Sequence, residues 1–132
     1  MLLERIRRDL YEVVAICGRN RDCQVTAFLR ENVSDRQARR MWTLLTEFVP
    51  REGPPLHNPL AAKHLRDGIY HFKRHPKKGK GVRVLWFFDE RRIVCTEALF
   101  KRDDALDDAI ARARVYRDQY LRDKKSNAVE IV

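Results

Sequence analysis

The pattern of hydrophobic and polar positions predicts a strand, two helices, three strands and a final helix, in that order. Residues 10–17 are rich in β-forming side chains and run into turn chemistry, which predicts a strand. Apolar positions at helical spacing then predict a short helix over residues 25–31 and a longer one over 34–49. A proline-rich connection follows, so the first half of the chain is expected to be mainly helical.

The longer helix has the strongest local signal. Ser34 and Gln37 have the spacing of a capping box, so the helix is expected to begin at Ser34 and to end at Pro50. Its apolar stripe comprises Ala38, Met41, Trp42, Leu45, Phe48 and Val49. The opposite face carries Arg36, Arg39, Arg40 and Glu47. We interpret that face as a solvated surface.

Three strand-like runs occupy the second half, over residues 69–75, 82–88 and 92–100. The short segments between them suit chain reversal, which predicts an antiparallel meander. The middle run is apolar on both faces and should be the central strand. A final helix is expected from Asp103 to about residue 121, because acidic residues begin it and basic residues end it.

These elements predict one α+β domain over residues 1–132, with a core of about 10–121. We expect a small antiparallel sheet, made of the N-terminal strand and the three-strand meander. Two N-terminal helices and one C-terminal helix should pack on it. The tail over 126–132 could either fray or add an edge strand.

The composition favours a protein that acts on a polyanion inside the cell. The net charge is +9, and residues 63–102 alone hold 12 Lys and Arg against 4 Asp and Glu. Such concentration is typical of nucleic-acid binding, although a generally basic surface is the alternative. Three cysteines and the lack of a long apolar run favour a cytoplasmic protein with reduced thiols and no membrane segment. We expect no disulfide or metal role for Cys17 and Cys23.

Strand alternation places the candidate chemistry. In residues 69–75, Tyr70 and Phe72 point one way, while His71, Lys73 and His75 point the other. Arg83 in the middle run is expected beside Lys73, in a shared groove. His71 and His75 would lie about 13 Å apart along a strand, too far to share a metal ion. No cofactor motif is present, so neither a metal nor a cofactor is expected.

Three segments in order resemble the HigB-like branch of the RelE/ParE toxins. They are Lys63-His64-Leu65-Arg66-Asp67-Gly68-Ile69-Tyr70, Val82-Arg83-Val84-Leu85-Trp86-Phe87-Phe88 and Leu99-Phe100-Lys101-Arg102. The resemblance implies a RelE-like fold, ribosome-dependent cleavage of mRNA, and a small antitoxin with a helix-turn-helix domain as partner. Two features depart from the family pattern: His71 stands where glutamate is frequent, and acidic residues follow Arg102.

The resemblance and the alternation together suggest roles for individual residues. RNA cleavage by the ribose 2′-OH needs proton-transfer groups and cations for the extra phosphate charge. Arg83 and Lys101 are expected to stabilise charge, Lys73 or His71 to transfer a proton, and Glu97 to be a possible base, although a salt bridge is the simpler role for it. Further RNA contacts are expected from Lys63, Arg74, His75, Lys77, Lys78, Lys80 and Arg102.

Two other functions fit the same pattern. A ParE-like inhibitor of DNA gyrase would need no converging cations, and a catalytically inactive relative would bind RNA without cutting it. The predicted function is a toxin of a type II toxin-antitoxin system, a metal-independent endoribonuclease that acts on ribosome-bound mRNA in the cytoplasm.

Overall fold

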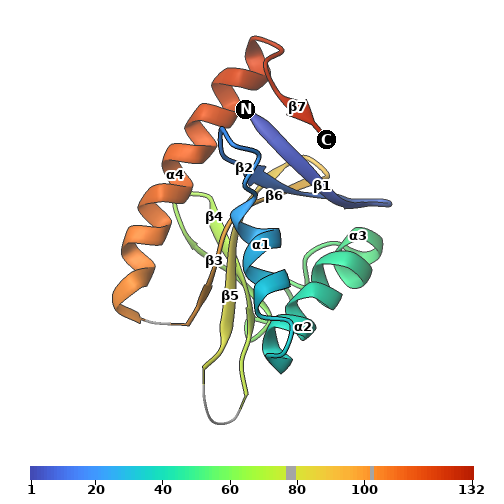
Figure 1. Cartoon of the computed structure of the whole chain (residues 1–132), viewed down its shortest axis with the longest axis vertical. Coiled ribbons are helices and arrows are strands. Elements are labelled where there is room, and N and C mark those ends of the chain that lie inside the picture. The colour runs from blue at the N-terminus through green and yellow to red at the C-terminus, as the bar shows by residue number, and fades with distance from the viewer. Residues whose placement is uncertain (77–79, 102) are drawn as a thin grey trace.

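A seven-stranded mixed sheet runs through the protein, with the strand order β3-β4-β5-β6-β2-β1-β7 (Figure 1). The computed structural model describes residues 1–76, 80–101 and 103–132. The strands are β1 (Leu2–Arg8), β2 (Glu12–Cys17), β3 (Ala62–Arg66), β4 (Ile69–Arg74), β5 (Val82–Asp89), β6 (Arg92–Phe100) and β7 (Glu130–Ile131). The helices are α1 (Gln24–Glu31), α2 (Arg36–Thr43), the π-helical segment η1 (Leu44–Phe48), α3 (Val49–Glu52) and α4 (Asp103–Lys125).

The prediction of a small antiparallel sheet of RelE-like fold is wrong. The sheet contains β1 and β3 in addition to the four predicted strands, and the tail adds the edge strand β7, one of the two outcomes left open for it. The sheet is mixed because β2 pairs parallel to β6 and β1 pairs parallel to β7. Strand β3 was not predicted because its mostly charged, exposed side chains lack the alternation of apolar and polar residues that indicates a strand. Asp67 and Gly68, both at positive φ, form the two-residue turn between β3 and β4.

The predicted meander is confirmed. Strands β4, β5 and β6 pair antiparallel in sequence order, and β5 is buried along most of its length. The middle position of the seven strands belongs to β6, however, because β2 adds on its far side. Strand β5 is therefore an interior strand rather than the central one.

Each face of the sheet has its own core. Segments α1, α2, η1 and α3 cover the face that carries Phe72, Val84 and Trp86. Helix α4 covers the opposite face, where it packs on Leu85 and Phe87 (Figure 1). The two layers of helix are needed because strands that are apolar on both faces must be shielded from water twice.

Helix α2 differs from its prediction at both ends. Its N-cap is Asp35, one residue later than expected, and the Asp35 carboxylate accepts hydrogen bonds from the backbone N–H groups of Gln37 and Ala38. Pro50 does not end the helical segment, because a proline is tolerated in the first turn of the new helix α3. The π-helical turn η1 changes the angular register, so Val49 is buried while Phe48 is 36% exposed.

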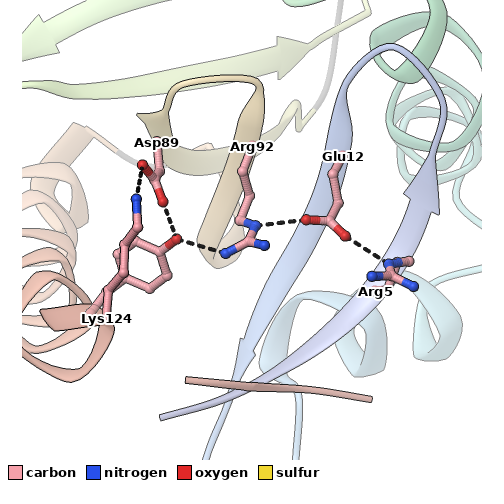
Figure 2. Close-up of polar contacts among 6 residues, drawn as sticks. Arg5, Glu12, Asp89, Arg92 and Lys124 are labelled. Atoms are coloured by element: carbon pink, nitrogen blue, oxygen red, sulfur yellow. Dashed lines mark hydrogen bonds and ion pairs between the residues drawn. The ribbon is translucent and has the colours of Figure 1, made fainter. Parts of the chain in front are cut away.

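A chain of polar contacts fastens α4 to the sheet (Figure 2). The Tyr120 hydroxyl donates a hydrogen bond to Asp89 and accepts one of 2.9 Å from Arg92, while Lys124 contacts the other Asp89 oxygen at 2.8 Å. Arg92 also donates to Glu12 at 2.6 Å. The network joins α4, the β5–β6 turn and β2 at the end of the sheet that lies near the chain termini (Figure 1).

The network also sets the protonation of its members. Burial alone would raise the pKa of the Asp89 carboxyl, but hydrogen bonds from Lys124 and Tyr120 outweigh it and hold that pKa below the ordinary range. Burial, followed by the hydrogen bond to Asp89, raises the pKa of Tyr120 to about 12. Tyr120 therefore remains a hydrogen-bond donor throughout the neutral range.

Cys17 and Cys23 form a disulfide, which corrects the expectation of three reduced thiols. The bond links the end of β2 to the residue before α1, across the turn of residues 18–22. The third cysteine, Cys95, is buried in β6. No helix in the described part of the chain has the length and apolar character of a membrane span.

We predict that Tyr120→Phe lowers the free energy of unfolding by about 1–3 kcal/mol, because it leaves partly buried atoms of Asp89 and Arg92 without their common partner. Chemical denaturation at neutral pH measures the change. Tyr116→Phe is the matched control, since Tyr116 lies one turn earlier on α4 and its side chain is only half-buried. Equal stability of Tyr120→Phe and the parent protein would contradict the anchoring role.

Candidate functional site

Five side chains converge on the α4 side of the sheet, and we call them the cationic cluster: Lys63, His71, Lys73, Arg83 and Lys101. Lys63 pairs across β3 and β4 with His71, and Lys73 pairs across β4 and β5 with Arg83. Lys101 follows β6, where its backbone N–H bonds the Gly81 carbonyl at 2.8 Å. Four separate chain segments therefore contribute to one small area.

Strand alternation explains why these residues share a face. Tyr70 and Phe72 belong to the core under α1 and α2, so His71 and Lys73 must point to the other face. On β5 the same rule puts Arg83 on the face of Leu85, which packs under α4. The face opposite Tyr70 and Phe72 is thus half apolar core and half cationic cluster.

Burial divides the cluster into a floor and a rim. His71 is 3% exposed and Arg83 is 4% exposed, whereas Lys73 is half-buried and Lys63 and Lys101 are exposed. The expected open groove is therefore a basic surface with an imidazole and a guanidinium beneath it. Burying a charged group such as the Arg83 guanidinium costs free energy unless a partner compensates the charge.

The electrostatic environment disfavours the charged forms of His71 and Lys73. Burial, and then the neighbouring charges led by Arg83 and Lys73, lower the pKa of His71 to about 3. Burial and the charges of Lys101, Arg83 and Lys63 lower the pKa of the Lys73 amine. His71 is thus neutral at pH 7, and neither of its ring nitrogens has a hydrogen-bond partner among the described residues.

The rim lysines differ from the cations elsewhere on the fold. Across residues 1–76, 80–101 and 103–132, no ion pair involves Lys63, Lys73 or Lys101. At the other end of the sheet, Arg92 and Lys124 are both paired with carboxylates. An anion bound at the rim would therefore meet positive charge that the described residues leave uncompensated.

Glu97 is held apart from this cluster by helix α4. Both of its carboxylate oxygens accept hydrogen bonds of 2.8 Å from the Arg112 guanidinium, one from Nε and one from Nη2. A bidentate pair of this kind fixes the orientation of the carboxylate. The geometry gives Glu97 the salt-bridge role rather than that of a base.

The other expected RNA contacts are dispersed. Arg74 points to the opposite face of β4, toward α2, and its neighbour His75 is exposed beyond the strand. The Lys80 ammonium lies 5.8 Å from the centre of the Phe100 ring, near the end of β6. Lys77, Lys78 and Arg102 lie outside the described residues. Of the expected contacts, Lys63 is the one that the structure brings into the cationic cluster.

Sequence reasoning interpreted the basic face of α2 as a solvated surface and missed the aromatic side chains that lie beside it. Arg36, Arg39 and Arg40 lie beside exposed aromatic side chains, Trp42 and Phe48, which were expected in the core. An arginine three residues before an aromatic residue on a helix was the available signal, because that spacing places both on one face. No group of three His, Cys, Asp or Glu residues in the described part could hold a metal ion.

We predict that His71 makes the protein less stable as the pH falls below about 6.5. The unfolded chain gains a proton at His71 near its ordinary pKa of 6.5, whereas the folded protein resists this until about pH 3. The free energy of unfolding should fall by about 1.4 kcal/mol for each pH unit in that window.

Chemical denaturation at pH 7, 6 and 5 measures this slope, and His71→Leu should flatten it. His57→Leu is the control, because His57 is exposed in the connection before β3. An unchanged slope in His71→Leu would show that the folded protein protonates His71 as readily as the unfolded chain.

Comparison of this chain with protein-family models, with curated proteins and with solved structures finds no match. The toxin resemblance is therefore carried by the three quoted segments alone. Function has to be argued from the cationic cluster itself, since a fold does not fix the chemistry that it supports.

Proposed function

We propose that this protein binds RNA at the cationic cluster and cleaves it there, as the toxin of a type II toxin-antitoxin system that acts on ribosome-bound mRNA in the cytoplasm. The observation that supports the proposal is the convergence of Lys63, Lys73, Arg83 and Lys101 on one buried, neutral histidine. The order of the three quoted segments adds the toxin class, while the wide mixed sheet gives it no support.

RNA binding follows from the rim of the cluster. Lys63 and Lys101 are exposed, and Lys73 is half-buried between them and the floor. Each ammonium that contacts a phosphate releases condensed counterions, which makes binding favourable and dependent on salt. Burial, followed by the neighbouring charges, lowers the pKa of Lys73, and a bound phosphate offsets the part that comes from those charges. Phosphate binding and protonation of the cluster are therefore coupled.

The proposed chemistry uses Lys73 as the proton-transfer group. In its neutral form the amine accepts the ribose 2′-OH proton while the 2′-oxygen forms a bond to phosphorus and the bond to the 5′-oxygen breaks. The Lys101 ammonium gives a proton to that leaving oxygen, and the buried Arg83 stabilises the added phosphate charge through its electric field from beneath the rim, without contacting the substrate. His71 is too deeply buried to reach the substrate, so we assign it a positioning role beside Lys73.

A small helix-turn-helix antitoxin is the proposed partner, and it would have to cover the rim of the cluster to block RNA. The disulfide between Cys17 and Cys23 lies at the end of β2, away from β3, β4 and β5 in the strand order. Its reduction in the cytoplasm would leave the residues of the cluster unchanged. The proposed location and chemistry therefore do not depend on the state of that bond.

We predict that RNA affinity depends steeply on salt and that the rim lysines carry this dependence. In Lys63→Gln/Lys73→Gln/Lys101→Gln, the slope of log affinity against log salt should fall by about 2 between roughly 50 and 200 mM salt. Fluorescence anisotropy with labelled single-stranded RNA measures the slope. The matched control is Arg19→Gln/Arg122→Gln/Lys125→Gln, which removes the same charge from exposed positions elsewhere. Equal slopes in the two variants would contradict binding at the cluster.

We predict that Lys73→Arg binds RNA almost as well as the parent but cleaves it about 100-fold more slowly or worse, because arginine keeps the charge and cannot release its proton at neutral pH. Single-turnover cleavage of ribosome-bound mRNA, with anisotropy for binding, separates the two effects. Lys80→Arg is the control, since Lys80 is exposed outside the cluster.

Other results would select the other functions. Undiminished cleavage by Lys73→Arg would leave Lys73 an electrostatic role only. RNA binding by the parent protein without any cleavage would select the inactive RNA-binding relative. Inhibition of DNA gyrase with intact mRNA would select the gyrase inhibitor.

A further inference from the structure

A second basic surface lies on the other side of the sheet, around helix α2. We call it the α2 surface and define it by Arg36, Arg39, Arg40, Trp42, Phe48, Arg51 and Arg74. Helix α2 supplies three arginines and Trp42. The arginines at positions 36, 39 and 40 face away from the core residues Gln37, Ala38 and Met41. Strand β4 supplies Arg74, which alternates with Lys73 of the cationic cluster.

Two neighbouring hollows shape this surface. One, of about 480 Å³, is lined by residues that include Trp42, Arg39 and Val33. The other, of about 570 Å³, is lined by residues that include Arg40, Arg74 and Phe48. The two hollows share Arg39 and Thr43 as lining residues, so they adjoin at these two side chains, one with an aromatic lining and the other mainly cationic.

The aromatic side chains of the α2 surface are unusually exposed to solvent. Trp42 is 42% exposed and Phe48 is 36% exposed, while the other tryptophan, Trp86, is fully buried between Tyr70 and Phe72. Exposing a large aromatic side chain forgoes the free energy that its burial would contribute. An exposed ring beside cations offers a stacking surface for a planar, negatively charged ligand.

The cationic hollow holds uncompensated charge. Five arginines line the second hollow together with one carboxylate, that of Glu47, and no ion pair among the described residues involves any of the five. Three of them are oriented by neutral acceptors instead. Arg39 donates to the Val33 carbonyl at 2.8 Å, Arg40 to Gln37 Oε1 at 2.7 Å, and Arg51 to the Glu47 carbonyl at 3.0 Å. Orientation without neutralisation leaves the guanidinium charge available to a ligand.

Arg74 is the least solvated of these arginines. Its Nε atom is buried without a hydrogen-bond partner among the described residues. Burial, followed by the charge of Arg40, lowers the pKa of its guanidinium, although arginine stays protonated. Two guanidinium groups held close together in this way form a natural seat for a phosphate, which accepts bidentate hydrogen bonds.

We propose that the α2 surface binds single-stranded RNA, with a base stacked on Trp42 and a phosphate held by Arg40 and Arg74. RNA is favoured over an acidic peptide because every cation here is an arginine, whose planar group both stacks on bases and pairs with phosphates, and because exposed rings alternate with those cations. The site shares its ligand class with the proposed function and none of its residues. It would engage RNA on the face opposite the cationic cluster.

Tryptophan fluorescence tests the proposal on the whole protein. Trp42 is exposed and Trp86 is buried, so quenching by an added ligand reports contact at Trp42. The probe is a single-stranded uridine oligonucleotide of about eight nucleotides, a length within the usual site size for such binding. A polyglutamate peptide of equal charge is the comparison ligand.

RNA should quench the fluorescence in a saturable manner, and Trp42→Phe should abolish that signal. Arg40→Gln and Arg74→Gln should each weaken the midpoint by about tenfold, a loss that corresponds to removing one charged contact to phosphate. Arg19→Gln, an exposed control, should leave the midpoint unchanged. The rim variant Lys63→Gln/Lys73→Gln/Lys101→Gln should still show the Trp42 signal, which separates this site from the cationic cluster.

Three results would overturn the proposal. Quenching by polyglutamate with none by RNA would assign the surface to an acidic protein partner. Quenching that Arg40→Gln and Arg74→Gln leave unchanged would remove the phosphate seat. If anisotropy shows that RNA binds the parent protein but Trp42 fluorescence is not quenched, the cationic cluster alone binds RNA.

Discussion

The rest of the structure depends on a sheet that is apolar on both faces. Strand β5 buries Val84 and Trp86 toward α1 and α2, and it buries Leu85 and Phe87 toward α4. Water must be excluded from both sides, so the chain needs a helical layer on each. The cationic cluster stands where the apolar part of the α4 face ends, and the α2 surface stands on the outer side of the other layer. Both candidate sites therefore lie where the helical layers no longer cover apolar surface of the sheet.

The elements with strong periodicity could be predicted from the sequence, and the sheet that they form could not. The meander and the main helices follow from local pattern, but the parallel pairing of β1 with β7 joins residues near opposite ends of the chain, which local pattern does not encode. Strand β3 carries Lys63, His64 and Arg66 on an edge, where burial imposes no alternation. The Asp67-Gly68 turn was the missed clue to it.

The sequence could predict which residues of the candidate site lie on the same face, but not how deeply each of them is buried. Alternation along β4 places His71 and Lys73 on one face, and that needs only the strand itself. The burial of His71 and Arg83 depends on tertiary packing, which no local pattern reveals. Trp42 and Phe48 fit an ideal helical stripe, but Trp42 lies at its margin and the π-helical turn displaces Phe48 from it, so both rings are partly exposed.

The parallel pairing of β2 with β6 has a kinetic consequence. Glu12 pairs with Arg92 and Ala15 with Cys95, so the interior of the sheet closes only when segments about 80 residues apart meet. Contacts this distant in sequence make folding slow, because the entropy of closing the intervening loop is lost before the contacts form. Until then β2 has one open, strongly apolar edge, which is the kind of surface that chains in a cell use to aggregate. A protein with this topology should depend on dilution or on chaperones during its synthesis more than its small size suggests.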